Sequence, residues 1–167
     1  MTALDVLPLD YVKESILEVD FPDKDDFIES LIKTSIAWVE KYTGYRLYER
    51  TEQFNVYPAS CDYGGRAVLP FFPITITEVK NKDGVVLEAD KTYLTEQGPL
   101  KLTVLAPVKS TIQATVGFTD VEDIPHPLID AACKLITYLY ENHSAYAASI
   151  PTDIQILINQ YRRDCTI

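Results

Sequence analysis

Cysteine and histidine, the residues that most often build disulfide frameworks and metal sites, are scarce in this chain of 167 residues. The three cysteines, Cys61, Cys133 and Cys165, are far apart and form no CxxC pair, so a disulfide framework is not expected. Cys133 falls in an apolar stripe and is predicted to be a small buried side chain. His126 and His143 stand at opposite ends of a predicted helix, roughly 25 Å apart, and cannot share a metal ion. We therefore expect no metal and no cofactor.

Motifs of common catalytic and nucleotide-binding sites are also absent, since the chain contains no HExxH, GxSxG, P-loop or GxGxxG pattern. Asp23, Asp25 and Asp26 resemble a calcium-binding loop only faintly, because no glycine or glutamate follows at the required positions. A helix start explains them better: Asp23 is the predicted N-cap, and the other two are favoured in the first turn by the helix dipole. We expect no enzymatic activity.

Long apolar runs are missing too. No run approaches the roughly 20 residues of a membrane span, and the N-terminus lacks the basic-then-apolar pattern of a signal peptide. We therefore expect a protein that is made and used without crossing a membrane.

Positive charge is in short supply: 15 lysines and arginines face 25 aspartates and glutamates, which gives a net charge of −10. Such a surface should not grip nucleic acid phosphates, because that requires clustered lysine and arginine. The acids are concentrated in the first thirty residues, either as a solvated face or as a surface that repels polyanions or meets a basic partner. They are Asp5, Asp10, Glu14, Glu18, Asp20, Asp23, Asp25, Asp26 and Glu29.

Apolar residues recur with helical periodicity in four stretches, which predict helices over 9–19, 26–42, 127–142 and from 152 onward. The third is the structural anchor of the fold, because its apolar side chains cover an arc of roughly 160°. With one aromatic residue of the second helix, it is expected to form the core spine: Leu128, Ile129, Ala132, Leu135, Ile136, Leu139 and Trp38.

The second helix carries three further expectations. Ser35 lies in the apolar arc, where its hydroxyl can donate to the carbonyl of Leu31. Glu40 falls on the polar half of the helix. Gly44 is the expected left-handed stop.

Between these helices the apolar period changes from 3.6 to 2, which predicts strands. The candidate strands are 47–57, 67–69, 74–80, 85–87, 93–95, 100–105 and 111–116. Asn81-Lys82-Asp83-Gly84 predicts a hairpin turn. The sequence thus predicts an α+β fold, a four-helix bundle with an inserted antiparallel β domain. We expect one domain over 1–167, with a helical part at 1–45 and 123–167 and a β insertion at about 46–118.

Aromatic residues gather near predicted strand ends and turns. They fit two interpretations equally: sheet core with cross-strand pairing, or a protein–protein interface. The residues are Tyr45, Tyr48, Tyr57, Tyr63, Phe71 and Phe72.

Several short motifs follow one another in a recognisable order. A helix ends on Tyr42-Thr43-Gly44, the β region closes on Val116-Gly117-Phe118, a proline-led helix ends on Tyr140-Glu141-Asn142, and the last helix ends on Tyr161-Arg162. In this order and spacing, over nearly the whole chain, they resemble the head–tail connector (adaptor) proteins of long-tailed bacteriophages and related prophages.

The resemblance implies a structural virion protein, assembled in the host cytoplasm, that forms a ring of about twelve copies beneath the portal protein at the head–tail junction. The ring would continue the DNA channel without binding DNA specifically, and it would present a surface for tail or stopper proteins. No membrane partner is implied. Docking on the portal is implied for the C-terminal segment, here Ile156, Tyr161, Arg162 and Arg163. The chain departs from the commonest form of the family in having His143 where an Asn-Arg pair often follows the helix, and in its short tail beyond Arg163.

Two alternatives stay open. The chain could be a tail-completion or stopper protein of the same neck, which differs only in its position along the axis. It could also be a small binding module whose β insertion holds a ligand such as a sugar on its tyrosines.

Overall fold

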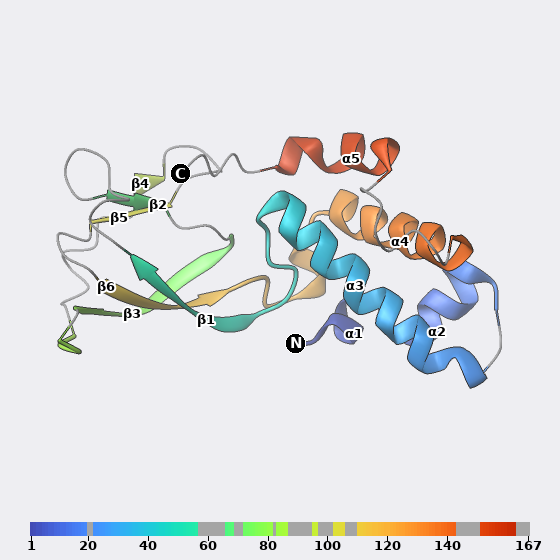
Figure 1. Ribbon diagram of the computed structural model, residues 1–167, viewed down its shortest axis with the longest axis horizontal. Helices are drawn as coiled ribbons and strands as arrows, with labels where there is room; N and C mark the ends of the chain where they lie inside the picture. Colours follow the sequence, from blue (N-terminus) through green and yellow to red (C-terminus); the bar gives the residue numbers. More distant parts are fainter. Residues whose placement is uncertain are drawn as a thin grey trace. The chain divides into compact units, whose positions relative to one another are not determined.

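The computed structural model describes residues 1–19, 22–56, 66–68, 72–81, 83–86, 95–96, 102–105, 110–142 and 151–162 (Figure 1). The chain has the predicted α+β fold, with helices on both sides of an antiparallel β region in the sequence. The α-helices are α1 (Ala3–Val6), α2 (Leu9–Tyr11), α3 (Asp25–Thr43), α4 (His126–Glu141) and α5 (Thr152–Ile158). The strands are β1 (Arg50–Val56), β2 (Arg66–Val68), β3 (Ile74–Asn81), β4 (Thr95–Glu96), β5 (Leu102–Leu105) and β6 (Ser110–Val116).

The chain forms two compact units. The helical unit consists of Met1–Glu49 and Phe118–Arg162, and the β unit of residues 50–117. None of the helices in the described ranges is long and apolar enough to cross a membrane.

The core of the helical unit lies where α3 packs against α4. Fully burying one leucine or isoleucine contributes about 1.5–3 kcal/mol, so this contact dominates the stability of the unit. Of the expected core spine, Ile129 and Trp38 are half-buried, whereas Ala131, which was not expected there, is buried. The buried members are Leu128, Ala132, Leu135, Ile136 and Leu139 on α4, opposed by Ile28, Leu31, Ile32, Ile36 and Val39 on α3.

The N-terminal segment differs from the single regular helix predicted over 9–19. Helix α2 continues into a π-helical turn, Val12–Leu17, which ends at Glu18 in the left-handed conformation with φ of 52°. This wider turn keeps Val12 fully buried and brings the Nζ of Lys13 to 2.6 Å from the carboxylate of Asp25 on α3. Helix α1 was not predicted. Its first turn is closed by Asp5, which accepts hydrogen bonds from the N–H and hydroxyl of Thr2.

The prediction of Asp23 as the N-cap of the second helix is wrong. Asp23 lies inside a 3₁₀ turn, Pro22–Lys24, and Lys24 occupies the N-cap position without a side-chain cap. The other end is as predicted: Gly44 follows α3 with φ of 80°, and its N–H donates to the carbonyl of Glu40 at 2.9 Å.

Two polar residues of α3 also differ from expectation. The hydroxyl of Ser35 is fully buried and has no hydrogen-bond partner among the described residues, so the predicted bond to Leu31 is not formed. Glu40 is buried, with 5% exposure, instead of lying on the polar half. Periodicity misplaces Glu40 because partners beyond the helix end determine its burial.

The β unit contains two antiparallel sheets of three strands each among its described residues, in the orders β1-β6-β3 and β2-β5-β4. Strand β1 begins at Arg50, three residues later than predicted. The predicted turn is present, since Asn81 accepts the N–H of Gly84 and pairs with Val85. Within the predicted strand 85–87, only an isolated bridge from Val86 to Lys80 lies inside the described residues.

The two faces of the β1-β6-β3 sheet differ in chemistry. On one face, the side chains of Val79, Ile112, Ala114 and Val116 are buried. The opposite face, here called the polar face, is largely exposed and consists mostly of uncharged polar side chains. Glu78 and Lys80 also lie there and form an ion pair at 2.6 Å. The uncharged residues of the polar face are Thr51, Gln53, Asn55, Thr75, Thr77, Thr111, Gln113 and Thr115.

Candidate docking site

The sequence places its candidate docking residues at the C-terminal end of the helical unit. Helix α5 is followed at once by a 3₁₀ turn, Asn159–Tyr161, and packs against α4 (Figure 1). Ile154 and Ile158 are buried on its inner side. Arg163 lies outside the described residues.

Ile156 points away from this packed side and is 72% exposed, the highest value among the large hydrophobic side chains of the described ranges. Its neighbours on the helix surface, Asp153, Asn159 and Gln160, are polar and exposed. Protein–protein contacts have apolar side chains at their centre and a polar rim, so Ile156 and its neighbours have the chemistry of a small contact.

Tyr161 and Arg162, by contrast, contact their own chain. The ring of Tyr161 meets the ring of Tyr45 edge-on, with centroids 6.0 Å apart. The guanidinium of Arg162 lies over the ring of Tyr42, 5.4 Å from its centroid. Tyr45 also stacks on Phe118 at 6.2 Å. We call these five residues the aromatic clasp.

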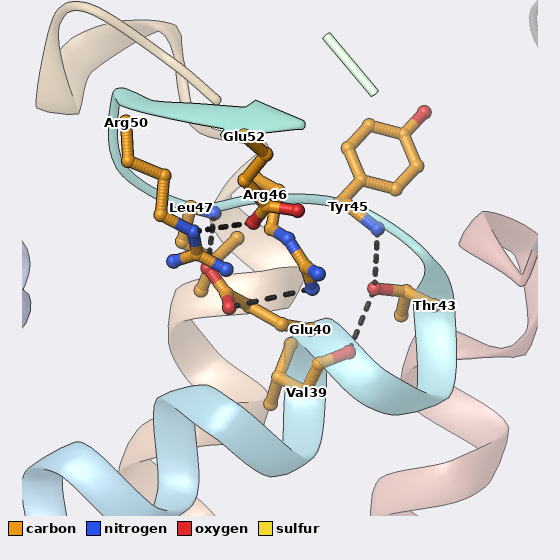
Figure 2. Close-up of polar contacts among 8 residues, drawn as sticks. All are labelled: Val39, Glu40, Thr43, Tyr45, Arg46, Leu47, Arg50 and Glu52. Carbon is orange, nitrogen blue, oxygen red and sulfur yellow. Dashed lines mark hydrogen bonds and ion pairs between the residues drawn. The ribbon is translucent and has the colours of Figure 1, made fainter. Parts of the chain in front are cut away.

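The clasp depends on how α3 ends. Gly44 reverses the chain in the left-handed conformation, which glycine adopts without steric penalty. Figure 2 shows the hydroxyl of Thr43 donating to the carbonyl of Val39 at 2.7 Å and accepting the N–H of Tyr45 at 3.2 Å. This small network fixes the backbone of Tyr45, whose side chain is only 7% exposed.

The side chain of Glu40 binds the residues that follow the end of α3. Its carboxylate accepts the N–H of Leu47 at 2.8 Å and pairs with the guanidinium of Arg46 at 3.6 Å (Figure 2). Both partners lie beyond the end of the helix, so the chain from Thr43 to Leu47 folds back over the last turn of α3. Sequence reasoning missed Glu40, and the only indication was its position one helical turn before Gly44.

Three of the four motifs that support the sequence resemblance meet at the clasp. Tyr42 belongs to the first motif, Phe118 ends the second, and Tyr161 with Arg162 forms the last. Three segments that are far apart in the sequence are therefore joined through these side chains.

Chemically reactive groups are few in the described part of the molecule. Cys133 is half-buried, and desolvation, assisted by the charge of Asp130, raises the pKa of its thiol to about 11. The thiol is therefore protonated at neutral pH and is a poor nucleophile. His126 is exposed, and His143 lies outside the described residues. Among the described residues, no group of three or more histidine, cysteine or acidic side chains could hold a metal ion.

Comparison with models of protein families finds no match, and comparison with curated proteins finds none either. Solved structures do match over nearly the whole chain. One is the virion of a native gene transfer agent (GTA) particle, with a TM-score of 0.73, 21% identity and coverage of 98% of this chain and 92% of that chain.

Two further matches are necks of GTA particles, and each covers 100% of this chain and 95% of the other. The neck of the empty particle, computed with C6 symmetry, gives a TM-score of 0.76 at 21% identity. The neck of the native particle, computed with C12 symmetry, gives 0.76 at 19% identity. The chain therefore has the fold of a chain found in the necks of these phage-like particles, as the sequence resemblance to connector proteins led us to expect.

Proposed function

We propose that this protein is a structural component of the neck of a phage or phage-like particle, a head–tail connector. It forms a ring beneath the portal protein, extends the DNA channel and offers the attachment surface for tail or stopper proteins. The observation that carries this proposal is the match of the entire chain to chains of GTA necks. A virion location follows from the same proposal, as does a structural role without catalysis.

The symmetry of those necks supports a ring. They were computed with C6 and C12 symmetry, which requires repeated copies around one axis. A ring of this kind is built head to tail, so two different surfaces of each subunit must be complementary. We propose a ring of about twelve copies.

The C-terminal segment is the proposed portal-docking element, with Ile156 as its apolar contact and Tyr161, Arg162 and Arg163 beside it. An exposed isoleucine gains free energy when a partner covers it, by about 25 cal/mol per Å² of apolar area removed from water. The exposure of 72% leaves most of this side chain available to a partner.

The charge of the chain suits a channel through which DNA slides. A net charge of −10 disfavours retention of DNA, because a polyanion is repelled by a surface of its own sign. The polar face of the β unit adds no positive patch, since Glu78 neutralises Lys80.

Measurement of molecular mass by light scattering, with and without the portal protein, tests the proposal. We expect the full chain to bind a portal ring in a number that matches the portal symmetry. Replacement of Ile156 by serine is expected to weaken binding by about tenfold, the size of a moderate interface contact. The matched control is Val85→Ser, which changes another exposed apolar side chain, 58% exposed, in the β unit.

Equal binding by wild type and Ile156→Ser, or by a chain shortened at residue 153, would show that α5 does not dock. If the chain does not bind the portal but binds the tail-side ring, it would be a stopper or tail-completion protein instead. The ligand-binding alternative gains no support from the described residues of the β unit, where no aromatic side chain is exposed for stacking.

A further inference from the structure

We propose that Tyr161 and Arg162 are positioning residues: they hold α5 against their own chain so that Ile156 is presented in one fixed orientation. This inference rests on the proposed function, because it assumes that α5 docks on the portal. Of the candidate docking residues, it assigns Ile156 as the apolar contact and Tyr161 and Arg162 as the groups that set its position.

Helix α5 cannot present a side chain by itself. It spans seven residues, Thr152–Ile158, whereas isolated helices shorter than about 12–15 residues are marginal in water. Its helical conformation therefore depends on tertiary contacts. The buried side chains Ile154 and Ile158 provide them along the inner side of the helix.

The clasp provides the contact at the C-terminal end. Tyr161 is the last residue of the 3₁₀ turn that follows α5, and its ring rests edge-on against Tyr45, which is almost completely buried. Arg162 adds a cation–π contact with Tyr42. Edge-to-face and cation–π pairs have preferred geometries, so they restrict orientation as well as stabilise the contact.

Tyr45 is a firm support because the network around Thr43 and Gly44 fixes its backbone and Phe118 stacks on its ring. The chain of contacts thus runs from the end of α3 through Tyr45 to Tyr161 and on to α5. A side chain held in its bound orientation loses less conformational freedom on binding, so the clasp should raise affinity without any contact to the partner.

The burial of Tyr45 makes this testable, because a side chain that is 7% exposed cannot itself contact the portal to any extent. We expect Tyr45→Ala and Tyr161→Ala each to weaken portal binding by about three- to tenfold. The double variant should be little weaker than either single one, since both changes remove the same contact. The matched control is Tyr11→Ala, which removes an exposed tyrosine of the helical unit.

Hydrogen exchange of the α5 amides without portal provides the second readout. Tyr45→Ala, Tyr161→Ala and Arg162→Gln should speed exchange in α5, Arg162→Lys should restore slow exchange because lysine keeps the cation, and Ile156→Ser should leave it slow. If Tyr45→Ala fails to fold, the Tyr161 and Arg162 variants still decide the matter.

Weak portal binding by Tyr161→Ala with unchanged exchange in α5 would overturn the inference and assign Tyr161 to the interface itself. Unchanged binding and unchanged exchange in both tyrosine variants would overturn it as well. If the wild-type chain does not bind portal at all, the proposed function fails. The exchange measurement then still shows whether the clasp holds α5.

Discussion

At the scale of single residues, Glu40 connects the last turn of α3 to the chain that follows it. A carboxylate that is 5% exposed is stabilised by its hydrogen bond from Leu47 and its pairing with Arg46. Burial of a charge is unfavourable unless such partners are present, so each partner depends on the other. Glu40 thus holds Arg46 and Leu47, next to the Thr43 network that fixes Tyr45 of the clasp.

Replacement of Glu40 by alanine leaves the Leu47 N–H and the Arg46 guanidinium without this acceptor, so we expect a loss of about 2–3 kcal/mol in the free energy of unfolding. Glu40→Gln should lose about 1 kcal/mol, because the amide oxygen can still accept the N–H. Urea unfolding followed by circular dichroism measures both, with Glu14→Ala as the exposed control. Equal midpoints for Glu40→Ala and the control would contradict the role assigned to Glu40.

Ser35 presents the opposite case, a buried hydroxyl without a partner among the described residues. Ser35→Ala removes an unsatisfied polar group and is expected to stabilise the protein by about 1 kcal/mol, which raises Tm by about 2–4 °C. Scanning calorimetry measures the shift. A lower Tm would mean that the hydroxyl has a hydrogen-bond partner in solution.

Cys133 makes the stability of the folded protein depend on pH. Its pKa is raised from 9.0 to about 11, so the folded protein keeps the thiol proton between these values while the unfolded chain releases it. The contribution of the protonated Cys133 thiol to the stability of the fold is therefore fully present below pH 9 and is lost as pH rises toward 11. With Cys61 and Cys165 replaced by serine, alkylation at pH 8 should be roughly a hundredfold slower in the folded than in the urea-unfolded chain. Equal rates would show that the thiol has an ordinary pKa.

At the scale of elements, two helical segments end in the left-handed conformation, one at Gly44 and one at Glu18. Glycine adopts positive φ freely, whereas glutamate does so against a steric penalty. Glycine is therefore favoured at both ends, so removing the glycine at position 44 and introducing one at position 18 should have opposite effects on stability.

We expect Gly44→Ala to destabilise the protein by about 1 kcal/mol and Glu18→Gly to stabilise it by about 0.5–1 kcal/mol. Denaturant unfolding of both variants in one buffer measures the pair. Glu14→Gly serves as a control within the same segment, where glycine should only destabilise. A loss of stability in Glu18→Gly would show that this end is not left-handed in solution.

Sequence periodicity predicts the elements that bury one clear side: α3 with its stop at Gly44, the proline-led α4, and most strand positions. Periodicity does not predict the π-helical turn at Val12–Leu17, because a single i→i+5 turn is too short to set an apolar period of its own. The start of α3 was misplaced because local capping preference favoured Asp23, while Asp25 is paired with Lys13 across the fold.

The residues of the candidate docking site also differ in whether the sequence predicts their placement. The outward direction of Ile156 follows from its spacing to Ile154 and Ile158, and it is visible in the sequence. The packing of Tyr161 on Tyr45 and the burial of Glu40 depend on segments more than a hundred residues apart or on a chain reversal. No local pattern encodes such contacts.

At the scale of the whole molecule, the chain enters and leaves the β unit at neighbouring positions. Arg50, the first residue of β1, pairs with Val116 at the end of β6. Directly opposed residues of an antiparallel pair lie about 4.5–5.5 Å apart, so a short linker could replace the unit between them.

We expect a chain in which residues 50–117 are replaced by three or four glycines to keep its helices, because closing so short a loop costs little entropy. Far-UV circular dichroism and amide exchange in α3 and α4 measure the outcome. Loss of protection in both helices would show that the two units fold only as a single domain, as the sequence analysis expected. A shortened chain that still binds portal would locate docking in the helical unit.

Trp38 has a consequence for future measurements. It is the single tryptophan of the chain and lies half-buried on α3, so its fluorescence reports on the helical unit alone. Far-UV circular dichroism reports on both units in the same sample. A temperature at which ellipticity changes and tryptophan emission does not would mark separate melting of the β unit, so the native chain carries its own spectroscopic reporter without any label.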